Sequence, residues 1–279
     1  MASDVVTVTV SVTVSSPSVT SLVLKHGLSA TAIALLLYGM KSGHLKNLRK
    51  RLFTLMVTRL TSDRMKAAVG RYKQPLFASL PTLHSADPSL RASGPGVLRI
   101  LEIGVGDGAN LQYYPSGCKL TSVEPNPYFE SYFKQNGHQF PHVSIDNFIH
   151  ASAEEMTAVE SESIDVVVST HVLCSVTHVA NCLKEASRVL VPGGQFFYFE
   201  HISYDWGDNS LAYLCQMVCE PIWSLVSDGC KLRRDPRPLI ADNFEIVKEE
   251  VVHIDDIYTL MKPHVIGIAR KPQNNENYQ

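Results

Sequence analysis

The chain has 279 residues, a formal net charge of −2 and 45% hydrophobic residues. This length and apolar content are enough for one complete α/β domain and leave an N-terminal segment to be explained. The near-neutral charge argues against a nucleic-acid-binding protein, because such proteins carry an excess of Lys and Arg to neutralise phosphates.

The first 44 residues are predicted to form a leader and a hydrophobic membrane anchor. Residues 2–20 alternate Val with Thr or Ser as a strand does, without an evident partner strand. Residues 22–40 are an apolar run that is short for a full transmembrane helix. Basic residues follow this run, which argues against a cleaved signal peptide and, by the positive-inside rule, keeps the downstream chain in the cytosol. An uncleaved membrane anchor is the favoured interpretation of this run, and a buried core helix of the domain is the alternative. The sequence also leaves open whether the run spans the bilayer or enters it from one side.

Residues 45–96 are predicted to be a basic amphipathic helical extension that ends in a linker. Leu and Met recur at helical spacing over residues 45–60, with Lys and Arg between them. Such a helix suits an anionic membrane surface, and a solvated helix packed on the domain explains the pattern equally well. Residues 64–80 lead onto the next domain, where they could cover a cofactor. Pro, Ser and Gly mark residues 81–96 as the linker.

Residues 97–110 predict a strand, a tight glycine turn and the start of a helix. Gly104, Gly106 and Gly108 allow positive φ angles and let a ligand approach the backbone closely. Their G-x-G-x-G spacing differs from the G-x-G-x-x-G of dinucleotide-binding turns. With Glu102 just before it, the turn resembles the first motif of S-adenosylmethionine-dependent methyltransferases.

The rest of the chain alternates strands with helices. Strands are predicted at residues 97–103, 119–124, 142–148, 163–170, 195–202, 244–252 and 264–269, and helices near 128–136, 179–189 and 211–226. Buried strands that alternate with helices indicate a mostly parallel sheet covered on both faces. We therefore predict a doubly wound, Rossmann-like α/β methyltransferase domain with a seven-stranded sheet over residues 97–272. A polar tail follows over 273–279.

Ligands of such sheets bind beyond the carboxyl ends of the strands, which selects the candidate residues. Glu124 ends the second strand about 20 residues after the first glycine, the spacing at which these folds place a carboxylate on ribose hydroxyls. S-adenosylmethionine is the predicted cofactor, and the other predicted binding residues are Glu102, Gly104, Gly106, Gly108, Pro125, Asn126, Ser152, Ala153 and Thr170. His171 and His201, after the fourth and fifth strands, are the predicted catalytic residues. Cys174 and Asp228 are also candidates near the acceptor, although packing or loop structure explains them more simply.

The six cysteines are scattered, with no C-x-x-C pair and no grouping of His and Cys at the spacing of zinc ligands. The sequence therefore predicts no metal site and a reducing compartment.

Several segments of the chain, taken together, distinguish one methyltransferase family from the others. They are Glu-Ile-Gly-Val-Gly-Asp-Gly-Ala-Asn, Glu-Pro-Asn-Pro-Tyr-Phe-Glu, Val-Val-Val-Ser-Thr-His-Val-Leu-Cys-Ser-Val, Arg-Val-Leu-Val-Pro-Gly-Gly, Phe-Glu-His-Ile and Asp-Gly-Cys-Lys-Leu-Arg-Arg-Asp. Over residues 52–270 the chain resembles the methyltransferase-like family of membrane-anchored thiol S-methyltransferases. The resemblance implies a small lipophilic thiol as methyl acceptor. It also implies anchorage at the endoplasmic reticulum membrane or lipid droplets, with the catalytic domain facing the cytosol.

Four residues depart from the pattern of that family: Val105, Asp107, Glu124 and His171. Glu124 keeps a carboxylate where the family has Asp, so ribose binding is expected to persist. His171 replaces Leu near the reacting methyl group, where it could alter the choice of acceptor or add a base.

Two other functions stay open on the sequence. One is methylation of a lipid or of a quinone ring at carbon or oxygen, and the other is a non-catalytic scaffold on membranes or lipid droplets. The intact glycine turn and Glu124 argue against the scaffold. Nucleic-acid methylation is disfavoured because the chain has no N/D-P-P-Y motif and its basic cluster adjoins the apolar run.

Overall fold

The computed structural model describes Gly39 and residues 45–273. The chain divides into two units, Met1–Leu45 and Lys46–Gln279, and the fold described below lies in the second. The predicted leader, nearly all of the predicted anchor and the tail beyond residue 273 fall outside the described residues. Among those described, no helix has the length and apolar character needed to cross a membrane.

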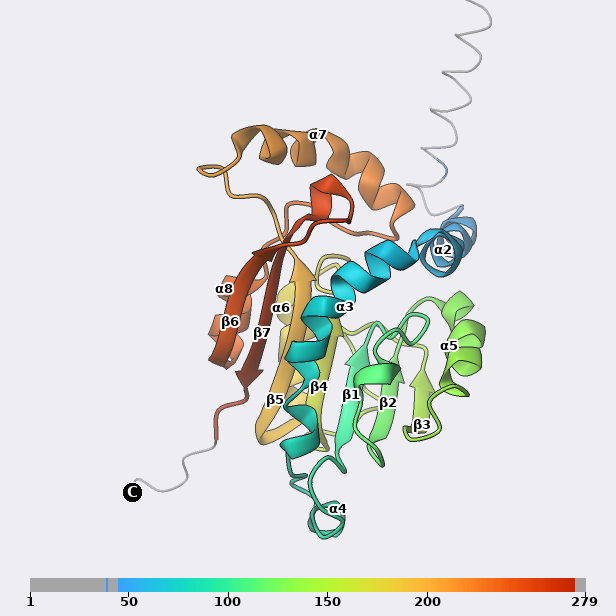
Figure 1. Ribbon diagram of the computed structural model, residues 1–279, viewed down its shortest axis with the longest axis vertical. Coiled ribbons are helices and arrows are strands. Elements are labelled where there is room, and N and C mark those ends of the chain that lie inside the picture. The colour runs from blue at the N-terminus through green and yellow to red at the C-terminus, as the bar shows by residue number, and fades with distance from the viewer. Residues whose placement is uncertain (1–38, 40–44, 274–279) are drawn as a thin grey trace, which may run out of the picture. The chain divides into compact units, whose positions relative to one another are not determined.

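The domain is built on a seven-stranded sheet with the order β3-β2-β1-β4-β5-β7-β6 (Figure 1). The strands are β1 (Arg99–Ile103), β2 (Lys119–Val123), β3 (Ser144–Ile149), β4 (Ile164–Thr170), β5 (Leu190–His201), β6 (Glu245–His253) and β7 (Pro263–Arg270). Strands β1 to β5 pair in parallel, whereas β7 pairs antiparallel with both β5 and β6. The predicted seven strands and Rossmann-like fold are confirmed, and the sheet is mixed.

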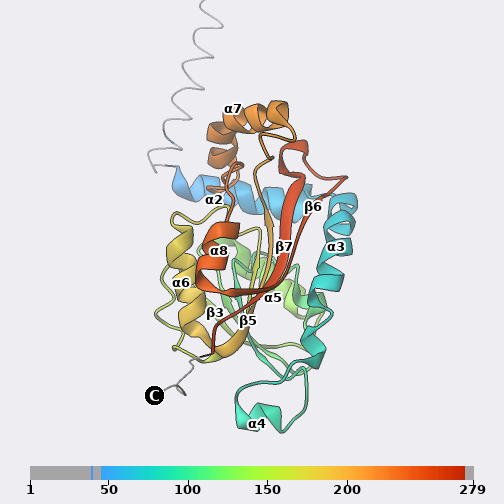
Figure 2. The ribbon, with the colours of Figure 1, turned by 90° about the vertical axis from the view of Figure 1, so that its left-hand side faces the viewer.

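Helices cover both faces of the sheet, as Figure 2 shows. On one face α6 (Val179–Val189) and α8 (Arg237–Asn243) pack on a core that includes Phe196 and Tyr198 of β5. On the other face α3 (Asp63–Phe77) packs on a core that includes Phe197 and Phe199. Successive side chains of a strand point to opposite faces, so one aromatic run in β5 contributes to both cores.

The remaining elements are short or peripheral. They are α2 (Lys46–Leu55), the π-helical turn η1 (Met56–Leu60), η2 (Leu80–Thr82), α4 (Pro88–Arg91), η3 (Leu111–Tyr113), η4 (Pro127–Phe129), α5 (Glu130–Gly137), α7 (Ser210–Val226) and η5 (Thr259–Met261). Helices α2 and α7 both lie beyond the carboxyl ends of the parallel strands (Figure 1). Ser62 caps α3 by accepting the N–H of Met65.

The predicted helix directly after the glycine turn is wrong. Residues that follow Gly108 form only the 3-10 turn η3, with the N–H of Leu111 bonded to the Gly108 carbonyl three residues back. Tyr114 is extended, with ψ of 142°, and precedes Pro115. A residue before proline is disfavoured in the helical region, which ends the turn before a helix can grow.

Helix α2 packs on the domain, one of the two interpretations that the sequence left open. Its leucines Leu48, Leu52 and Leu55 are about half exposed, while Thr54 is buried. The side that carries Thr54 and Phe53 contacts the protein, with the Phe53 ring 6.0 Å from that of Phe129, and the leucines face outward.

Candidate active site

The glycine turn after β1 holds three glycines at positive φ. Gly104, Gly106 and Gly108 have φ angles of +64°, +55° and +85°. A Cβ on Gly104 would lie 2.5 Å from Cγ2 of Val172, whereas a Cβ on Gly106 would meet no atom within 4 Å. The turn is therefore closed on the side of Gly104 and open at Gly106, where a ligand can approach the backbone.

Glu124 joins the end of β2 to the glycine turn. Its carboxylate accepts the N–H of Gly106 at 3.0 Å and the N–H of Asn126 at 2.8 Å. Burial raises the pKa of Glu124, and these two bonds oppose that rise. A carboxylate has about four lone-pair positions, so the two backbone bonds leave others for hydroxyl donors.

Pro125 and Asn126 connect this corner to α2. The Lys50 ammonium donates to the Pro125 carbonyl. The Asn126 side-chain amide donates to the Lys50 carbonyl and to the Thr54 hydroxyl, both at 3.2 Å. The two predicted binding residues thus hold α2 over the end of β2 (Figure 1).

Glu102 lies at the centre of a buried polar network. Its carboxylate accepts the side-chain amide of Asn110 at 2.7 Å and the hydroxyl of Tyr114 at 2.6 Å. Asn110 also donates to the hydroxyl of Thr170 at 3.0 Å and accepts the ammonium of Lys73 at 2.8 Å. The structure therefore brings Glu102 and Thr170, predicted from separate strands, onto one shared partner.

Lys73 carries a positive charge from α3 into this network and was not predicted from the sequence. Burial lowers the pKa of Lys73 to about 8, against the opposing effect of Glu102. Burial likewise raises the pKa of Glu102 to about 7, although Tyr114 and Asn110 oppose the rise. The sequence did hold one indication that Lys73 is buried. Lys73 lies on the same helical face as the apolar residues Leu76 and Phe77, which follow it by three and four residues.

Ser152 and Ala153, predicted to meet the adenine edge, follow β3. The Ser152 hydroxyl donates to Glu154 at 3.1 Å and accepts the N–H of the same residue at 3.2 Å. Ala153 is buried in the core beneath α6. Glu154 in turn accepts the N–H groups of Thr177 and His178. These residues therefore shape the loop after β3 and tie it to the segment after β4.

His171, one predicted catalytic residue, follows β4 at a φ of +60° and pairs with His264 of β7. The two Nε2 atoms lie 2.9 Å apart, and Nδ1 of His264 lies 3.1 Å from the Lys262 carbonyl. A carbonyl only accepts, so His264 carries its proton on Nδ1 and His171 donates its own from Nε2. Burial and the neighbouring His264 hold the pKa of His171 well below 6.5, and burial lowers that of His264 to about 3. The pair is neutral at pH 7, with Nδ1 of His171 left as a weak proton acceptor.

His201, the other predicted catalytic residue, ends β5 beside Cys230. Its Nε2 lies 3.0 Å from the Cys230 sulfur, and its buried Nδ1 has no partner among the described residues. A hydrogen bond from Cys174 and the nearby His201 hold the pKa of Cys230 at about 4. Cys174 thus joins the group, whereas Asp228 instead forms an ion pair with Arg49 of α2 at 3.3 Å. Sequence spacing could not reveal this group, because its members lie about 30 residues apart and meet only through the fold.

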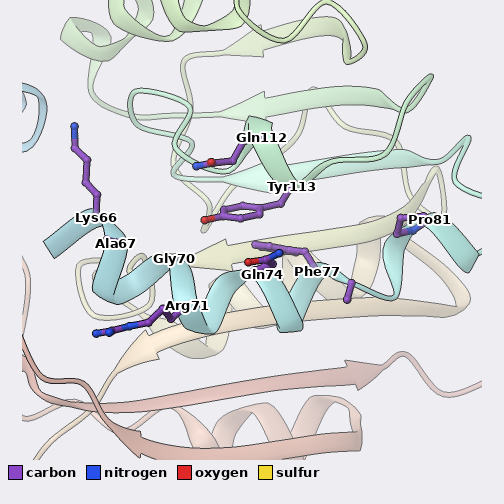
Figure 3. Close-up of a pocket in the computed structure, with 10 residues that line it drawn as sticks. Lys66, Ala67, Gly70, Arg71, Gln74, Phe77, Pro81, Gln112 and Tyr113 are labelled. Carbon is purple, nitrogen blue, oxygen red and sulfur yellow. The ribbon is translucent and has the colours of Figure 1, made fainter. Parts of the chain in front are cut away.

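A separate hollow of about 790 Å³ runs along the outer side of α3, between that helix and Tyr113 (Figure 3). Lys66 and Arg71 project from the helix at its rim (Figure 3). None of the predicted cofactor or catalytic residues lines it. The site therefore lies at the carboxyl edge of the sheet, apart from this hollow.

Comparison with known proteins decides the family. Residues 101–198 match the model of a methyltransferase domain. The chain is 35% identical over 223 residues to thiol S-methyltransferase TMT1B of Rattus norvegicus, which spans 80% of this chain and 87% of that protein. It is 37% identical over 200 residues to thiol S-methyltransferase TMT1A of Homo sapiens, covering 71% and 78%. This chain belongs to the thiol S-methyltransferase family.

Membership of this family makes the protein a methyltransferase that uses S-adenosylmethionine. The predicted enzyme class and cofactor are thereby confirmed. A solved structure supports the fold alone: a putative sarcosine dimethylglycine methyltransferase from Galdieria sulphuraria matches with a TM-score of 0.53 at 12% identity, covering 75% of this chain and 88% of that one.

Proposed function

We propose that this enzyme transfers the methyl group of S-adenosylmethionine to a small lipophilic thiol. We further propose that it works at the endoplasmic reticulum membrane or at lipid droplets, with its catalytic domain facing the cytosol. The observation that carries the methyl-donor side is the bond between the Glu124 carboxylate and the Gly106 N–H, which joins the open glycine turn to a carboxylate with spare lone pairs. The acceptor is proposed from the named activity of the relatives.

The residues present fit the cofactor. Gly106 leaves space where a side chain would otherwise stand, and Glu124 can accept ribose hydroxyls without giving up its backbone bonds. Thr170 and Asn110 stand beside the same turn. The bound cofactor supplies an electrophilic methyl group on a sulfonium, and the protein has to align an acceptor with it.

Thiol methylation needs a thiolate held in line with the methyl group and shielded from water. We assign the acceptor side to His171, which directly follows β4, and His201, which ends β5. The pKa of His171 is depressed by burial, so the imidazole ring stays uncharged at neutral pH. This environment favours a small lipophilic acceptor over a charged one.

An exposed apolar stripe on α7 supports access from a membrane. Leu211, Val218 and Ile222 are 71%, 71% and 60% exposed and lie on one side of the helix. Contiguous exposed apolar surface marks sites that contact membranes or other proteins. Helix α7 lies beyond the carboxyl ends of the strands (Figure 1), and its Trp223 donates to the Cys230 sulfur beside His201.

The direct test is methyl transfer from labelled S-adenosylmethionine to a small alkyl thiol by detergent-solubilised full-length protein. Glu124→Ala should lose at least about 10-fold in cofactor affinity, because bonds to a charged group contribute roughly 1.5–3 kcal/mol each. Glu245→Ala, at an exposed position of β6, is the matched control and should keep full turnover.

Each alternative has its own outcome in this assay. Methylation of phenols or lipids but not of thiols would move the assignment to a lipid or quinone acceptor. Undiminished cofactor binding in Glu124→Ala would overturn the assigned role of Glu124.

A further inference from the structure

Cys174, His201 and Cys230 form a buried cluster with the donor set of a metal site. The two sulfur atoms and one ring nitrogen all lie within 4.8 Å of one another, and the three residues are between 1% and 5% exposed. Tetrahedral zinc with bonds of about 2.3 Å to sulfur and 2.0–2.1 Å to nitrogen would put these atoms roughly 3.6–3.8 Å apart. Two thiolates and one imidazole, with a fourth position open, are a ligand set used by catalytic zinc sites.

The loop that carries Cys174 is fixed from two directions. The Glu200 carboxylate accepts the N–H groups of Val172 at 3.1 Å and Leu173 at 3.2 Å. The Arg234 guanidinium donates to the carbonyls of Leu173 and Cys174, at 2.9 and 3.2 Å. Both clamps are charged groups, so the thiol is held in place without help from a ligand.

Cys230 is brought to the same point by a tight turn. Gly229 has a φ of +101°, and a Cβ there would lie 3.2 Å from the Ser175 carbonyl. The N–H of Lys231 donates to the Cys174 carbonyl at 2.9 Å, which ties the two cysteine loops together. The Trp223 ring N–H also donates to the Cys230 sulfur, at 3.3 Å. Outer bonds of this kind orient metal ligands.

We propose that these three residues bind zinc and that the fourth position of the metal takes the acceptor thiol. The proposal rests on the thiol methylation proposed above and supplies a group that binds the acceptor as a thiolate. His171 has its Nε2 proton committed to His264, and His201 has its Nε2 committed to the cluster. Cys174 lies just beyond Thr170, the last residue of β4, and His201 is the last residue of β5. Val172, in the same loop as Cys174, lies against Gly104 of the glycine turn, so we place a thiolate bound at the cluster near the proposed cofactor site.

The reaction balances without an oxidant or a reductant. On binding, the acceptor thiol gives its S–H proton to solvent and forms a sulfur–zinc bond. A lone pair of this sulfur then forms a bond to the methyl carbon, and the methyl–sulfonium bond breaks with its electron pair passing to the cofactor sulfur. The product is a neutral thioether, which has lost the charge that held it to zinc and leaves.

Metal binding can be measured without activity. Reduced, metal-free, full-length protein in detergent should bind about one Co²⁺ or Zn²⁺ per chain, and the Co²⁺ form should show a thiolate-to-cobalt charge-transfer band. Cys174→Ser, His201→Asn and Cys230→Ser should each weaken Zn²⁺ binding about 100-fold, whereas Cys182→Ser, at a buried cysteine of α6, should not. No Co²⁺ or Zn²⁺ binding by folded wild-type protein, or a Cys174–Cys230 disulfide that persists under reductant, would overturn the site.

The acceptor part of the proposal has a separate test. Adding a small alkyl thiol should shift the visible Co²⁺ spectrum, and an unchanged spectrum would overturn thiol coordination. Thiol turnover that persists at the wild-type rate in Cys230→Ser would overturn the metal's role and leave thiol methylation standing. A shifted spectrum in a protein that methylates no thiol would instead overturn the proposed function and leave the metal site standing.

Discussion

At the scale of single residues, Gly104 and Gly106 differ in their surroundings although both have positive φ. An added Cβ at Gly104 would collide with Val172, while one at Gly106 would enter open space. An L-residue in this conformation costs about 1–2 kcal/mol at either position. Only Gly104 adds a steric clash to that cost, and only Gly106 faces the space proposed for the cofactor.

We predict that Gly106→Ala and Gly104→Ala separate binding from folding. Gly106→Ala should lower the free energy of unfolding by about 1–2 kcal/mol and weaken S-adenosylmethionine binding by more than 10-fold, because its Cβ would stand where the ligand approaches the backbone. Gly104→Ala should lower stability by about 3 kcal/mol or more. Denaturant unfolding and calorimetric titration measure the two effects.

Gly117→Ala is the control for backbone strain alone. Gly117 has a φ of +80°, and its added Cβ would make an ordinary contact with Val97 at 3.6 Å. It should therefore lose stability like Gly106→Ala and keep full cofactor affinity. Equal affinity in Gly106→Ala and Gly117→Ala would contradict the proposed approach of the ligand at Gly106.

Local spacing determined which site residues the sequence could predict. The glycines and Glu124 come directly after predicted strands, so a short stretch of sequence is enough to predict their place in the site. Lys73 and His264 reach the site from α3 and β7, and no short-range pattern links either to the glycine turn. Their roles depend on the order of strands in the sheet, which becomes visible only in the folded chain.

At the scale of elements, Asp165 connects three segments at the amino end of the sheet. Its carboxylate accepts bonds from the Ser85 hydroxyl at 2.6 Å, the Ala86 N–H at 2.9 Å and both the backbone and the guanidinium of Arg99. The predicted linker over residues 81–96 is therefore pinned to β4 and β1. Sequence composition identified this stretch as irregular but could not show that it is tied to a strand some 80 residues away.

We predict that Asp165→Asn lowers the free energy of unfolding by about 2 kcal/mol at pH 7, because it leaves the partly buried Arg99 with only the more distant carboxylate of Asp87, at 3.9 Å. Burial alone would raise the pKa of Asp165, but the bonds from Arg99 and Ser85 outweigh burial and hold the pKa below the ordinary 3.8. The stabilisation is thus present above pH 3.8 and lost as the pH falls through the lower folded value. Denaturant unfolding at several pH values measures it.

Asp255→Asn is the matched control, because the Asp255 side chain is 80% exposed and forms its ion pair with Lys262, at 2.9 Å, on the surface. It should leave the free energy of unfolding nearly unchanged, because exposed ion pairs contribute little to stability. A wild-type advantage over Asp165→Asn that stays constant from pH 7 to pH 2 would show that the carboxylate charge is not the source of the stabilisation.

At the scale of the whole molecule, the apolar stripe of α7 and the outward leucines of α2 lie at one end, beyond the carboxyl edge of the sheet (Figure 1). Arg49 of α2 and Asp228, just after α7, join the two helices through their ion pair. The same end of the domain holds the proposed cofactor and acceptor sites. A lipophilic acceptor dissolved in a bilayer would therefore reach the site from this end.

We predict that combining Leu211→Asp, Val218→Asp and Ile222→Asp raises KM about 10-fold for a long-chain thiol dissolved in lipid vesicles, because charged side chains would oppose the proposed contact of this stripe with the bilayer surface. Turnover of a short, water-soluble thiol should stay unchanged. Val247→Asp with Val251→Asp on β6 is the control, because these residues are also exposed and apolar but lie on an edge strand. An equal loss for both thiols would point to damage of the active site instead.

The fold was more predictable than its details. Largely apolar strands such as β4 alternate with helices such as α6 along the chain. This pattern predicts the doubly wound fold, because apolar side chains on both faces of a sheet are buried only when helices cover both faces. The 3-10 turn after Gly108 was missed because a single proline, Pro115, decides it against the general strand–turn–helix pattern. The outward leucines of α2 were ambiguous because a heptad of Leu and basic residues allows either side to face the protein.

The place of β7 between β5 and β6 has a consequence for biosynthesis. Among the strands of the described residues β7 comes last in chain order, yet within them it is the only strand that pairs with β6 and it is the outer neighbour of β5. A nascent chain that stops before Pro263 has already made the glycine turn and Glu124, but it lacks His264 and leaves the aromatic strand β5 with an open edge. Open hydrophobic edges pair with other chains. Prematurely terminated products are therefore expected to aggregate and be degraded, so they do not accumulate as cofactor-binding proteins without activity.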